Sequence, residues 1–147
     1  VIEGGQAIPF EIKRVFYIYD SDDTVVRGQH ANRESEFVLV NVAGESKVRI
    51  TDGTEEIIVK LDKPMMGLYI PKMLWKDMYD FSRDSVLLVL ANTHYDGAEY
   101  IRDYDEYLKE MKDRNLALKK WLLLFANLLT QTITAGVHCF MTEVYII

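Results

Sequence analysis

The sequence predicts an all-β protein, a sandwich or barrel of short strands, followed by a helical segment near the C-terminal end. Short runs rich in β-branched and aromatic residues recur about every ten residues. Gly, Asp, Asn and Pro stand between these runs, as in the turns of antiparallel sandwiches and barrels. Helical periodicity is absent until about Gly97, which places the helical segment after the strands.

The composition is that of a globular domain with a hydrophobic core. The chain has 147 residues, of which 49% are apolar and 27% are charged. A net charge of −6 argues against nucleic acid as a partner, because phosphate binding needs a clustered positive field. The single Cys139 cannot form an internal disulfide, so we expect a cytoplasmic protein. No secretory signal is visible, and because Val1 is not a methionine we expect the native start upstream.

The first half of the chain contains three clear strand runs besides the stretch 26–42. Residues 12–19 form a β-branched and aromatic run that ends at a cluster of Asp and Ser. Residues 47–50 alternate between apolar and polar side chains, and 56–61 repeat the pattern after Asp52-Gly53, a turn typical of tight hairpins. These two runs are therefore expected to pair as a hairpin.

The stretch 26–36 and the apolar run 37–42 that follows it have two interpretations. If 26–36 is a strand, His30, Asn32 and Glu34 share one face, opposite Arg27, Gln29 and Arg33. Titratable groups would then face a pocket. Alternatively, the strand begins only at Phe37 and the charged residues form a solvated loop.

Three more runs complete the predicted sheets. Residues 67–71 and 74–81 are expected to form the next pair of strands, and 85–91 is nearly continuous in apolar residues, as in a strand buried on both faces.

The remainder of the chain changes character. Residues 100–111 repeat apolar side chains at three- and four-residue steps, which predicts an amphipathic helix or two helical turns packed over one end of the barrel. Residues 116–129 form a helix that is apolar on most of its circumference, and must be buried, dimer-forming or membrane-associated. A membrane-spanning helix would have to include the polar residues after 129, so no membrane partner is expected. Residues 130–134 and 144–147 look extended, and the role of 113–147 is unknown.

Several motifs resemble the nucleotide-sugar 3,4-ketoisomerases, small WxcM-like cupins that act on dTDP-4-keto-6-deoxyglucose. The motifs occur in the right order between residue 1 and about residue 112. They are IPFEIKRVFYIYD at 8–20, RGQHAN at 27–32, GLYIP at 67–71, WKDMYDFS at 75–82, YD at 95–96 and YIRDY at 100–104.

The resemblance implies a fold and an assembly. The family fold is the cupin double-stranded β-helix, or jelly roll, and its members are usually homodimers with exchanged N-terminal strands. We therefore expect a cupin domain over residues 1–112, whose family start lies upstream of Val1, and an atypical apolar tail over 113–147.

The implied reaction moves a ketone between carbons 4 and 3 of a dTDP-linked 4-keto-6-deoxyhexose. It removes the proton on carbon 3, passes through an enediol and protonates carbon 4, steps suited to an imidazole. The family commonly has His-Ala-His on one strand; here the first position is His30 and the second is Asn32. An amide cannot transfer a proton at neutral pH, although it can orient a hydroxyl or stabilise an enolate oxygen.

His30 must therefore carry out both proton transfers or share them with Tyr17, Lys76 or a bound water. Lys76 stands where relatives often have a His after the strand Trp. A lysine desolvated against Trp75 could act as an acid or base, whereas a solvent-facing lysine would have no such role. Both readings of Lys76 are open from the sequence.

The resemblance also assigns residues to substrate binding. Arg14 and Arg27 are expected near the pyrophosphate, because guanidinium groups bind phosphate oxygens. Tyr19, with Tyr17, is expected near the hexose or the base, and Trp75 is expected to wall the pocket.

No catalytic metal and no other cofactor are expected. Gly28, His30, Asn32, Glu36 and Gly44 trace the spacing of the first metal-binding cupin motif, but Asn32 replaces one His ligand. The histidine of the second motif is missing as well, and the two remaining ligands make a poor site.

Three functions from different classes follow from these observations. The favoured one is a nucleotide-sugar 3,4-ketoisomerase that feeds the synthesis of deoxysugars for surface polysaccharide. A non-catalytic nucleotide-sugar-binding module is the alternative, with Asn32 marking lost chemistry. A structural jelly roll that assembles through its apolar tail is the third.

Overall fold

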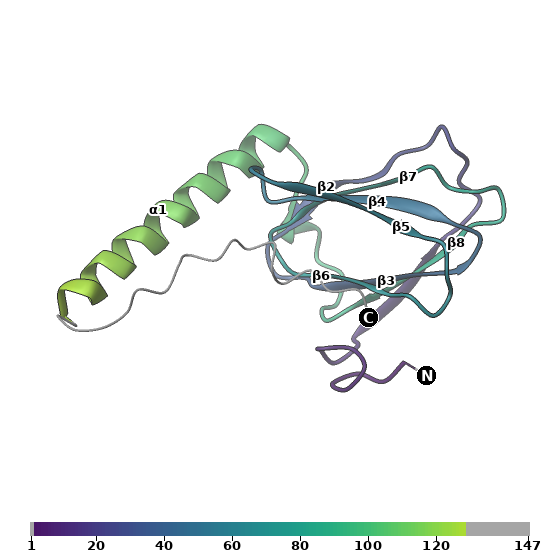
Figure 1. Cartoon of the computed structure of the whole chain (residues 1–147), viewed down its shortest axis with the longest axis horizontal. Coiled ribbons are helices and arrows are strands. Elements are labelled where there is room, and N and C mark those ends of the chain that lie inside the picture. The colour runs from purple at the N-terminus through teal and green to yellow at the C-terminus, as the bar shows by residue number, and fades with distance from the viewer. Residues whose placement is uncertain (1, 129–147) are drawn as a thin grey trace.

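A computed structural model describes residues 2–128, with side chains described through residue 117. Two β-sheets face each other, and one long helix extends from one end of the sandwich (Figure 1). The elements are β1 (Arg14–Ile18), β2 (Arg27–Asn32), β3 (Phe37–Ala43), β4 (Ser46–Thr51), β5 (Glu56–Leu61), β6 (Leu68–Ile70), β7 (Trp75–Tyr79), β8 (Val86–Ala91), the 3-10 helix η1 (Gly97–Glu99), β9 (Tyr100–Ile101) and α1 (Tyr104–Leu128).

The strands alternate between the two sheets in the manner of a jelly roll. One sheet has the order β1-β8-β3-β6 and the other has the order β5-β4-β7-β2-β9. Every strand pair within these sheets is antiparallel. Together with the C-terminal helix, this arrangement confirms the expected all-β, cupin-like fold.

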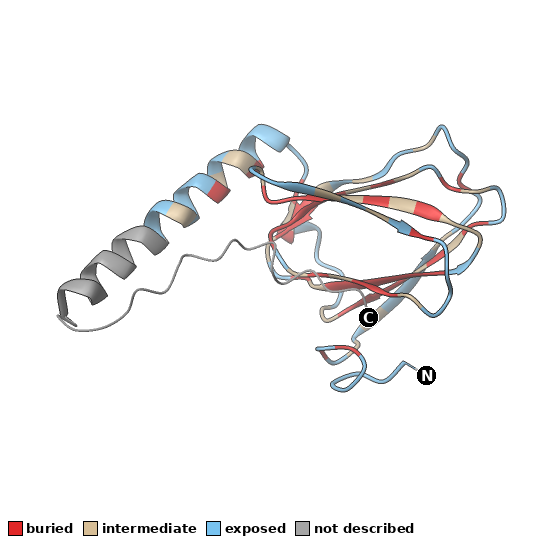
Figure 2. Cartoon of the chain, viewed as in Figure 1, coloured by how far each residue is buried: buried red, intermediate tan, exposed pale blue. Residues whose placement is uncertain are grey.

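The main core lies between the sheets. Alternate side chains of each strand point inward, so one face of each sheet is apolar and buried. Figure 2 shows the buried positions concentrated along the strands that face each other. The fully buried side chains include Leu39, Ile50, Leu68 and Leu87.

Several sequence expectations are confirmed by the strand register. Residues 47–50 and 56–61 form the hairpin β4–β5, in which Ile50 lies opposite Ile57. The run at 12–19 contains β1, and the apolar run at 85–91 contains β8, which lies between β1 and β3 inside its sheet. Leu87 and Val89 pack in the core between the sheets, whereas Leu90 packs on the other face in a second cluster with Ile8 and Phe10, so both faces of β8 are covered. This double coverage explains its composition.

One expected strand pairing is wrong. The runs at 67–71 and 74–81 do not pair with each other, because β6 pairs with β3 and β7 pairs with β4 and β2. In the stretch 26–36, residues 27–32 form the strand β2 and His30 faces a cavity, so the strand interpretation is confirmed and the solvated-loop alternative is wrong. Strands β2 and β3 belong to opposite sheets, and the turn between them carries the chain across the sandwich.

The C-terminal segment differs from the expected helix at 100–111. Tyr100–Ile101 is the short strand β9, which pairs with the end of β2, and α1 begins at Tyr104 and continues past residue 112. Tyr107 and Met111 pack on the outer side of the sheet against Ala31. The runs at 130–134 and 144–147 lie outside the described residues. No helix in the described part of the chain combines the length and apolar character needed to cross a membrane.

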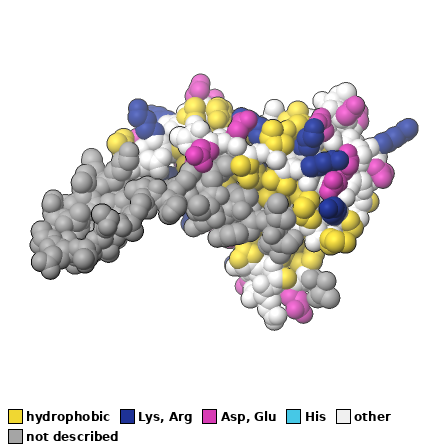
Figure 3. Space-filling model, viewed as in Figure 1, with side chains coloured by type: hydrophobic (Ala, Val, Ile, Leu, Met, Phe, Trp, Pro, Cys, Tyr) yellow, Lys and Arg dark blue, Asp and Glu magenta, His cyan; other side chains and the backbone are white. Residues whose placement is uncertain are grey.

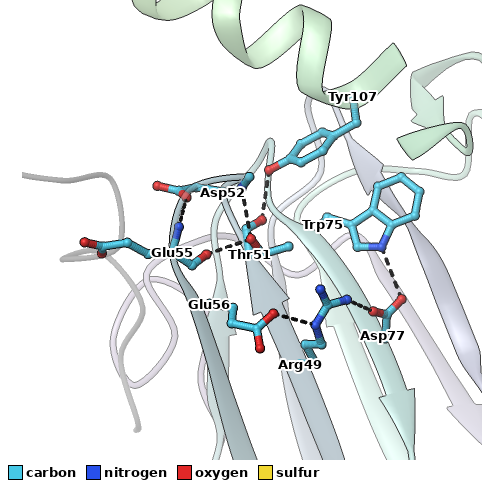
Figure 4. A network of polar contacts seen from close by, with 9 residues as sticks. Arg49, Thr51, Asp52, Glu55, Glu56, Trp75, Asp77 and Tyr107 are labelled. Carbon is cyan, nitrogen blue, oxygen red and sulfur yellow. Dashed lines mark hydrogen bonds and ion pairs between the residues drawn. The ribbon is translucent and has the colours of Figure 1, made fainter. Parts of the chain in front are cut away.

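Polar contacts fasten the start of α1 to the sandwich. The Tyr107 hydroxyl lies 2.8 Å from the carbonyl oxygen of Thr51 and 3.2 Å from that of Met73. Figure 4 shows Tyr107 reaching from the helix to the end of β4, beside Trp75. Arg33, directly after β2, forms ion pairs with Glu106 and Glu110 of α1.

The outer surface of the sandwich carries mixed charges. Figure 3 shows acidic and basic side chains interspersed over the described part of one face, without a continuous basic stripe. Pairs such as Lys60 with Glu45, at 2.7 Å, account for part of this pattern. A surface of this kind fits the net charge of −6.

The Tyr107 hydroxyl is expected to contribute measurably to stability. Tyr107→Phe leaves two buried carbonyl oxygens without this donor, so we expect a loss of about 1–2 kcal/mol in the free energy of unfolding. Urea denaturation measures it, with Tyr19→Phe as the control because Tyr19 is 61% exposed. Equal stability of the two variants would contradict the role given to this contact.

Candidate active site

A cavity of about 200 Å³ lies between the two sheets, and the paired strands β2 and β7 line one side of it. Its floor is apolar and includes Phe37 and Leu39 of β3. Arg27, His30, Lys76 and Tyr100 bring polar groups to its wall. An apolar cavity with a few convergent polar groups is the usual form of a small-molecule site.

A β-bulge at Gly28-Gln29 aims two side chains of β2 into this cavity. Both residues have positive φ, 87° and 53°, and the register with β7 shifts between Gly28 and His30. The extra residue puts Arg27 and His30 on the same side, which corrects the expected alternation that placed them on opposite faces. Glycine is required at 28, because a Cβ there would lie 2.6 Å from the carbonyl oxygen of Lys76.

The bulge also sets the tautomer of His30. The ring Nδ1 lies 2.7 Å from the carbonyl oxygen of Gly28. A carbonyl can only accept, so Nδ1 carries the hydrogen and Nε2 of the neutral ring keeps its lone pair. The ring also packs on Tyr100, with centroids 4.7 Å apart. Burial first, and then the charge of Lys76, lower the pKa of His30 to about 4, so the imidazole is a neutral base at pH 7.

Lys76 lies directly across from His30 in the register of β2 and β7. It is 4% exposed, which excludes the solvent-facing alternative. Its Nζ donates a hydrogen bond of 2.6 Å to Oδ1 of Asn32 and lies 4.7 Å from the centre of the Phe37 ring. Burial lowers the pKa of Lys76 to about 7, which makes this amine able to exchange a proton near neutral pH.

Asn32 stands behind Lys76 rather than on the cavity wall. It is 2% exposed, and its Nδ2 donates to Oε1 of Glu99 at 3.2 Å. Asn32 thus connects a buried ammonium to a buried carboxylate. Each end of its amide has a partner within the protein, and Asn32 does not line the cavity.

The two arginines predicted to bind substrate lie on different strands near the cavity. Arg27 is exposed and lines the cavity. Arg14 of β1 stacks its guanidinium over Phe16 and Tyr95, at 5.6 Å from each ring centre. Its Nε and Nη2 are buried and have no hydrogen-bond partner in the described part of the chain. Free buried donors of this kind suit an anionic ligand.

Three predicted site residues lie away from the cavity. Tyr17 and Tyr19 are 56% and 61% exposed on the face of β1 opposite Phe16 and Ile18, which point inward. Trp75 lies on the face of β7 opposite Lys76, packed against Tyr107, with its indole N–H donating to Asp77 at 3.2 Å (Figure 4). Alternation along each strand is the reason in both cases, and the expectation that Trp75 walls the pocket is not supported.

Sequence reasoning missed two residues at this site. Tyr100 lines the cavity because it belongs to β9, whereas its spacing had suggested a helix. Glu99 is 8% exposed and binds the turn between β2 and β3 as well as Asn32. The motif at 100–104 was the available signal for Tyr100; no signal pointed to Glu99.

A metal site does not stand out. Within the described part of the chain, no group of three or more His, Cys, Asp or Glu side chains gathers in a way that could hold an ion. The expectation of no catalytic metal remains a prediction.

Comparisons with known proteins place these features in a family. The family model described as "FdtA: WxcM-like, C-terminal" matches residues 1–112. A TDP-4-oxo-6-deoxy-α-D-glucose-3,4-oxoisomerase from Aneurinibacillus thermoaerophilus is 44% identical over 115 residues, covering 78% of this chain and 83% of that protein.

Solved structures agree with the sequence comparison. The TDP-fucose-3,4-ketoisomerase WlaRA from Campylobacter jejuni is 46% identical with a TM-score of 0.73, covering 75% of this chain and 82% of that one. The sugar 3,4-ketoisomerase QdtA from Thermoanaerobacterium thermosaccharolyticum, solved in complex with TDP, is 45% identical with a TM-score of 0.75, covering 78% and 83%.

The charge of Lys76 is expected to hold down the pKa of His30. In the Lys76→Met variant, we expect the NMR titration midpoint of the His30 ring to rise from about 4 toward its ordinary 6.5, because a neighbouring positive charge is removed. Lys72→Met is the matched control, since Lys72 is exposed and lies outside this cavity. An unchanged midpoint in Lys76→Met would show that the two groups do not interact.

Proposed function

The chain belongs to the FdtA family of WxcM-like proteins, and on that basis we propose that it moves the keto group between carbons 4 and 3 of a dTDP-linked 4-keto-6-deoxyhexose. It is a nucleotide-sugar 3,4-ketoisomerase, as the 44% identical relative is named. The chemical assignment rests on the neutral imidazole of His30, because this ring lines the cavity and its Nε2 keeps a lone pair that can accept a proton.

His30 is the base in this proposal. Its Nε2 takes the proton from carbon 3, and the electrons of that C–H bond form the enediol double bond between carbons 3 and 4. The hydrogen bond from Nδ1 to Gly28 stabilises the imidazolium that results. The ring then delivers a proton to carbon 4, and exchange of the imidazolium proton with solvent lets deuterium enter the sugar when the enediol is reprotonated at carbon 3 in deuterium oxide.

Lys76 is the partner acid. Its ammonium donates to the oxygen on carbon 4 as that ketone becomes a hydroxyl, and its amine accepts the proton of the oxygen on carbon 3 as the new ketone forms. Hydrogens and electrons balance within the sugar, so the reaction needs no oxidant. Asn32 transfers no proton in this scheme and holds Lys76 in place.

The cavity has room for a sugar ring but not for a complete nucleotide sugar. Its volume of about 200 Å³ is below the range of about 300–1,000 Å³ typical of sites for larger ligands. The diphosphate therefore lies at the mouth, where Arg27 is exposed, and the buried donors of Arg14 suit one of its oxygens. A homodimer and a cytoplasmic location are part of this proposal and rest on the family resemblance and on the single cysteine.

Isotope exchange tests the isomerase directly. The protein, incubated with dTDP-4-keto-6-deoxyglucose in deuterium oxide, is expected to introduce deuterium at carbon 3, as seen by proton NMR. His30→Ala should lower the rate by at least about a hundredfold, in line with general acid–base catalysis. His94→Ala is the control, because His94 is exposed and lies outside the cavity. Tight dTDP binding without exchange for any of several ketosugars would favour the binding module instead.

The pH profile should report the two proton-transfer groups. His30 must be neutral, so kcat/KM rises as pH increases through its pKa of about 4. Lys76 must be protonated, so kcat/KM falls as pH increases through its pKa of about 7. Steady-state rates across pH 4–9 measure both limbs. A flat profile from pH 7 to 9 would exclude Lys76 as the acid.

A further inference from the structure

Glu99 is a buried carboxylate behind the cavity that contacts both the turn after β2 and Asn32. Its Oε2 accepts from the backbone N–H groups of Glu34 and Ser35, at 3.1 and 2.8 Å. Its Oε1 accepts from Nδ2 of Asn32 at 3.2 Å and also from the hydroxyl of Ser35. Both oxygens receive donors, which is the pattern of a carboxylate fixed in position.

This carboxylate determines which way the Asn32 amide points. An amide has a donor end and an acceptor end, and Glu99 can only engage the donor end. The oxygen of Asn32 therefore faces Lys76, whose Nζ lies 2.6 Å away. If the amide turned over, its NH₂ group would meet the ammonium and both would lose their partners.

The orientation of Lys76 follows from this bond. An ammonium has three donors. One is engaged by Asn32, and the Phe37 ring lies beside the same group at 4.7 Å, so a donor is left for a ligand in the cavity that Lys76 lines. The chain of contacts runs from Glu99 through Asn32 to Lys76 and ends at the cavity.

We infer that Glu99 is a positioning residue of the reaction, which through the Asn32 amide orients Lys76 and keeps it protonated at the cavity wall. The inference rests on the proposed function, in which Lys76 is the acid. It gives Asn32 a constructive role: the amide joins a carboxylate to an ammonium without titrating itself, where the family commonly has a second imidazole.

The charged groups around Lys76 determine the direction of the expected effects. Glu99 on η1 is the largest influence that favours its protonated form, and Asp77 on β7 acts in the same direction. Arg14 on β1 opposes it, and His30 on β2 lies opposite Lys76 but is neutral above about pH 4. Removing the Glu99 charge should therefore release the Lys76 proton at lower pH.

Opposite charge changes at two positions test the inference. Glu99→Gln should move the alkaline limb of kcat/KM to lower pH by at least half a unit, while Asn32→Asp, which adds a carboxylate against Lys76, should move it to higher pH. Glu36→Gln is the matched control. Glu36 accepts a hydrogen bond from the Tyr69 hydroxyl at 3.0 Å and has no contact with Lys76. The alkaline limb of kcat/KM should therefore not move in Glu36→Gln.

A second measurement does not depend on turnover. In protein labelled with carbon-13 lysine, the Cε signal of Lys76, assigned with Lys76→Met, should titrate with the same two shifts. If the wild-type protein turns over no ketosugar, the proposed function fails while this titration still judges the contact chain. The inference would be overturned if Lys76 titrated at the wild-type pH in the folded Glu99→Gln and Asn32→Asp proteins. It would also be overturned if these variants lost kcat/KM equally at every pH, with the alkaline limb unmoved.

Discussion

The close approach of Gly28 to the backbone of β7 is the constraint on which the site depends. Only a residue without a side chain can lie there, since a Cβ would meet the Lys76 carbonyl at 2.6 Å. The bulge that results turns Arg27 and His30 to the same side and presents the Gly28 carbonyl to Nδ1 of His30. One irregularity in an otherwise regular ladder thus supplies the direction, the tautomer and the free lone pair of the base.

The second constraint is electrostatic. His30 and Lys76 lie side by side on paired strands in an apolar cavity, where two positive charges cannot both be solvated. The protein resolves this by separating their pKa values to about 4 and about 7. Neighbouring groups whose environments push their pKa values apart can be assigned as base and acid. Glu99 is the largest influence that favours the charged form of Lys76 and only a small one on His30, so it helps to keep the two pKa values apart.

Pattern reasoning located the strands well and their partners less well. Alternation and turn residues identify the β4–β5 hairpin because its pairing is local, whereas β6 and β7 are neighbours in sequence that join opposite sheets. His30 and Lys76 could be proposed from motif residues alone. The inward turn of Arg27 could not, because a bulge breaks the period of two, nor could Glu99, whose partners are more than 60 residues away. The outward faces of Trp75 and Tyr17 follow from register, which only the sheet determines.

The small size of the cavity has an evolutionary consequence. A space of about 200 Å³ can hold a hexose but not a complete nucleotide sugar. One set of side chains then binds the nucleobase, and a separate set rearranges the sugar. Substitutions on the rim can therefore change which nucleotide is bound without altering the imidazole of His30 or the amine of Lys76.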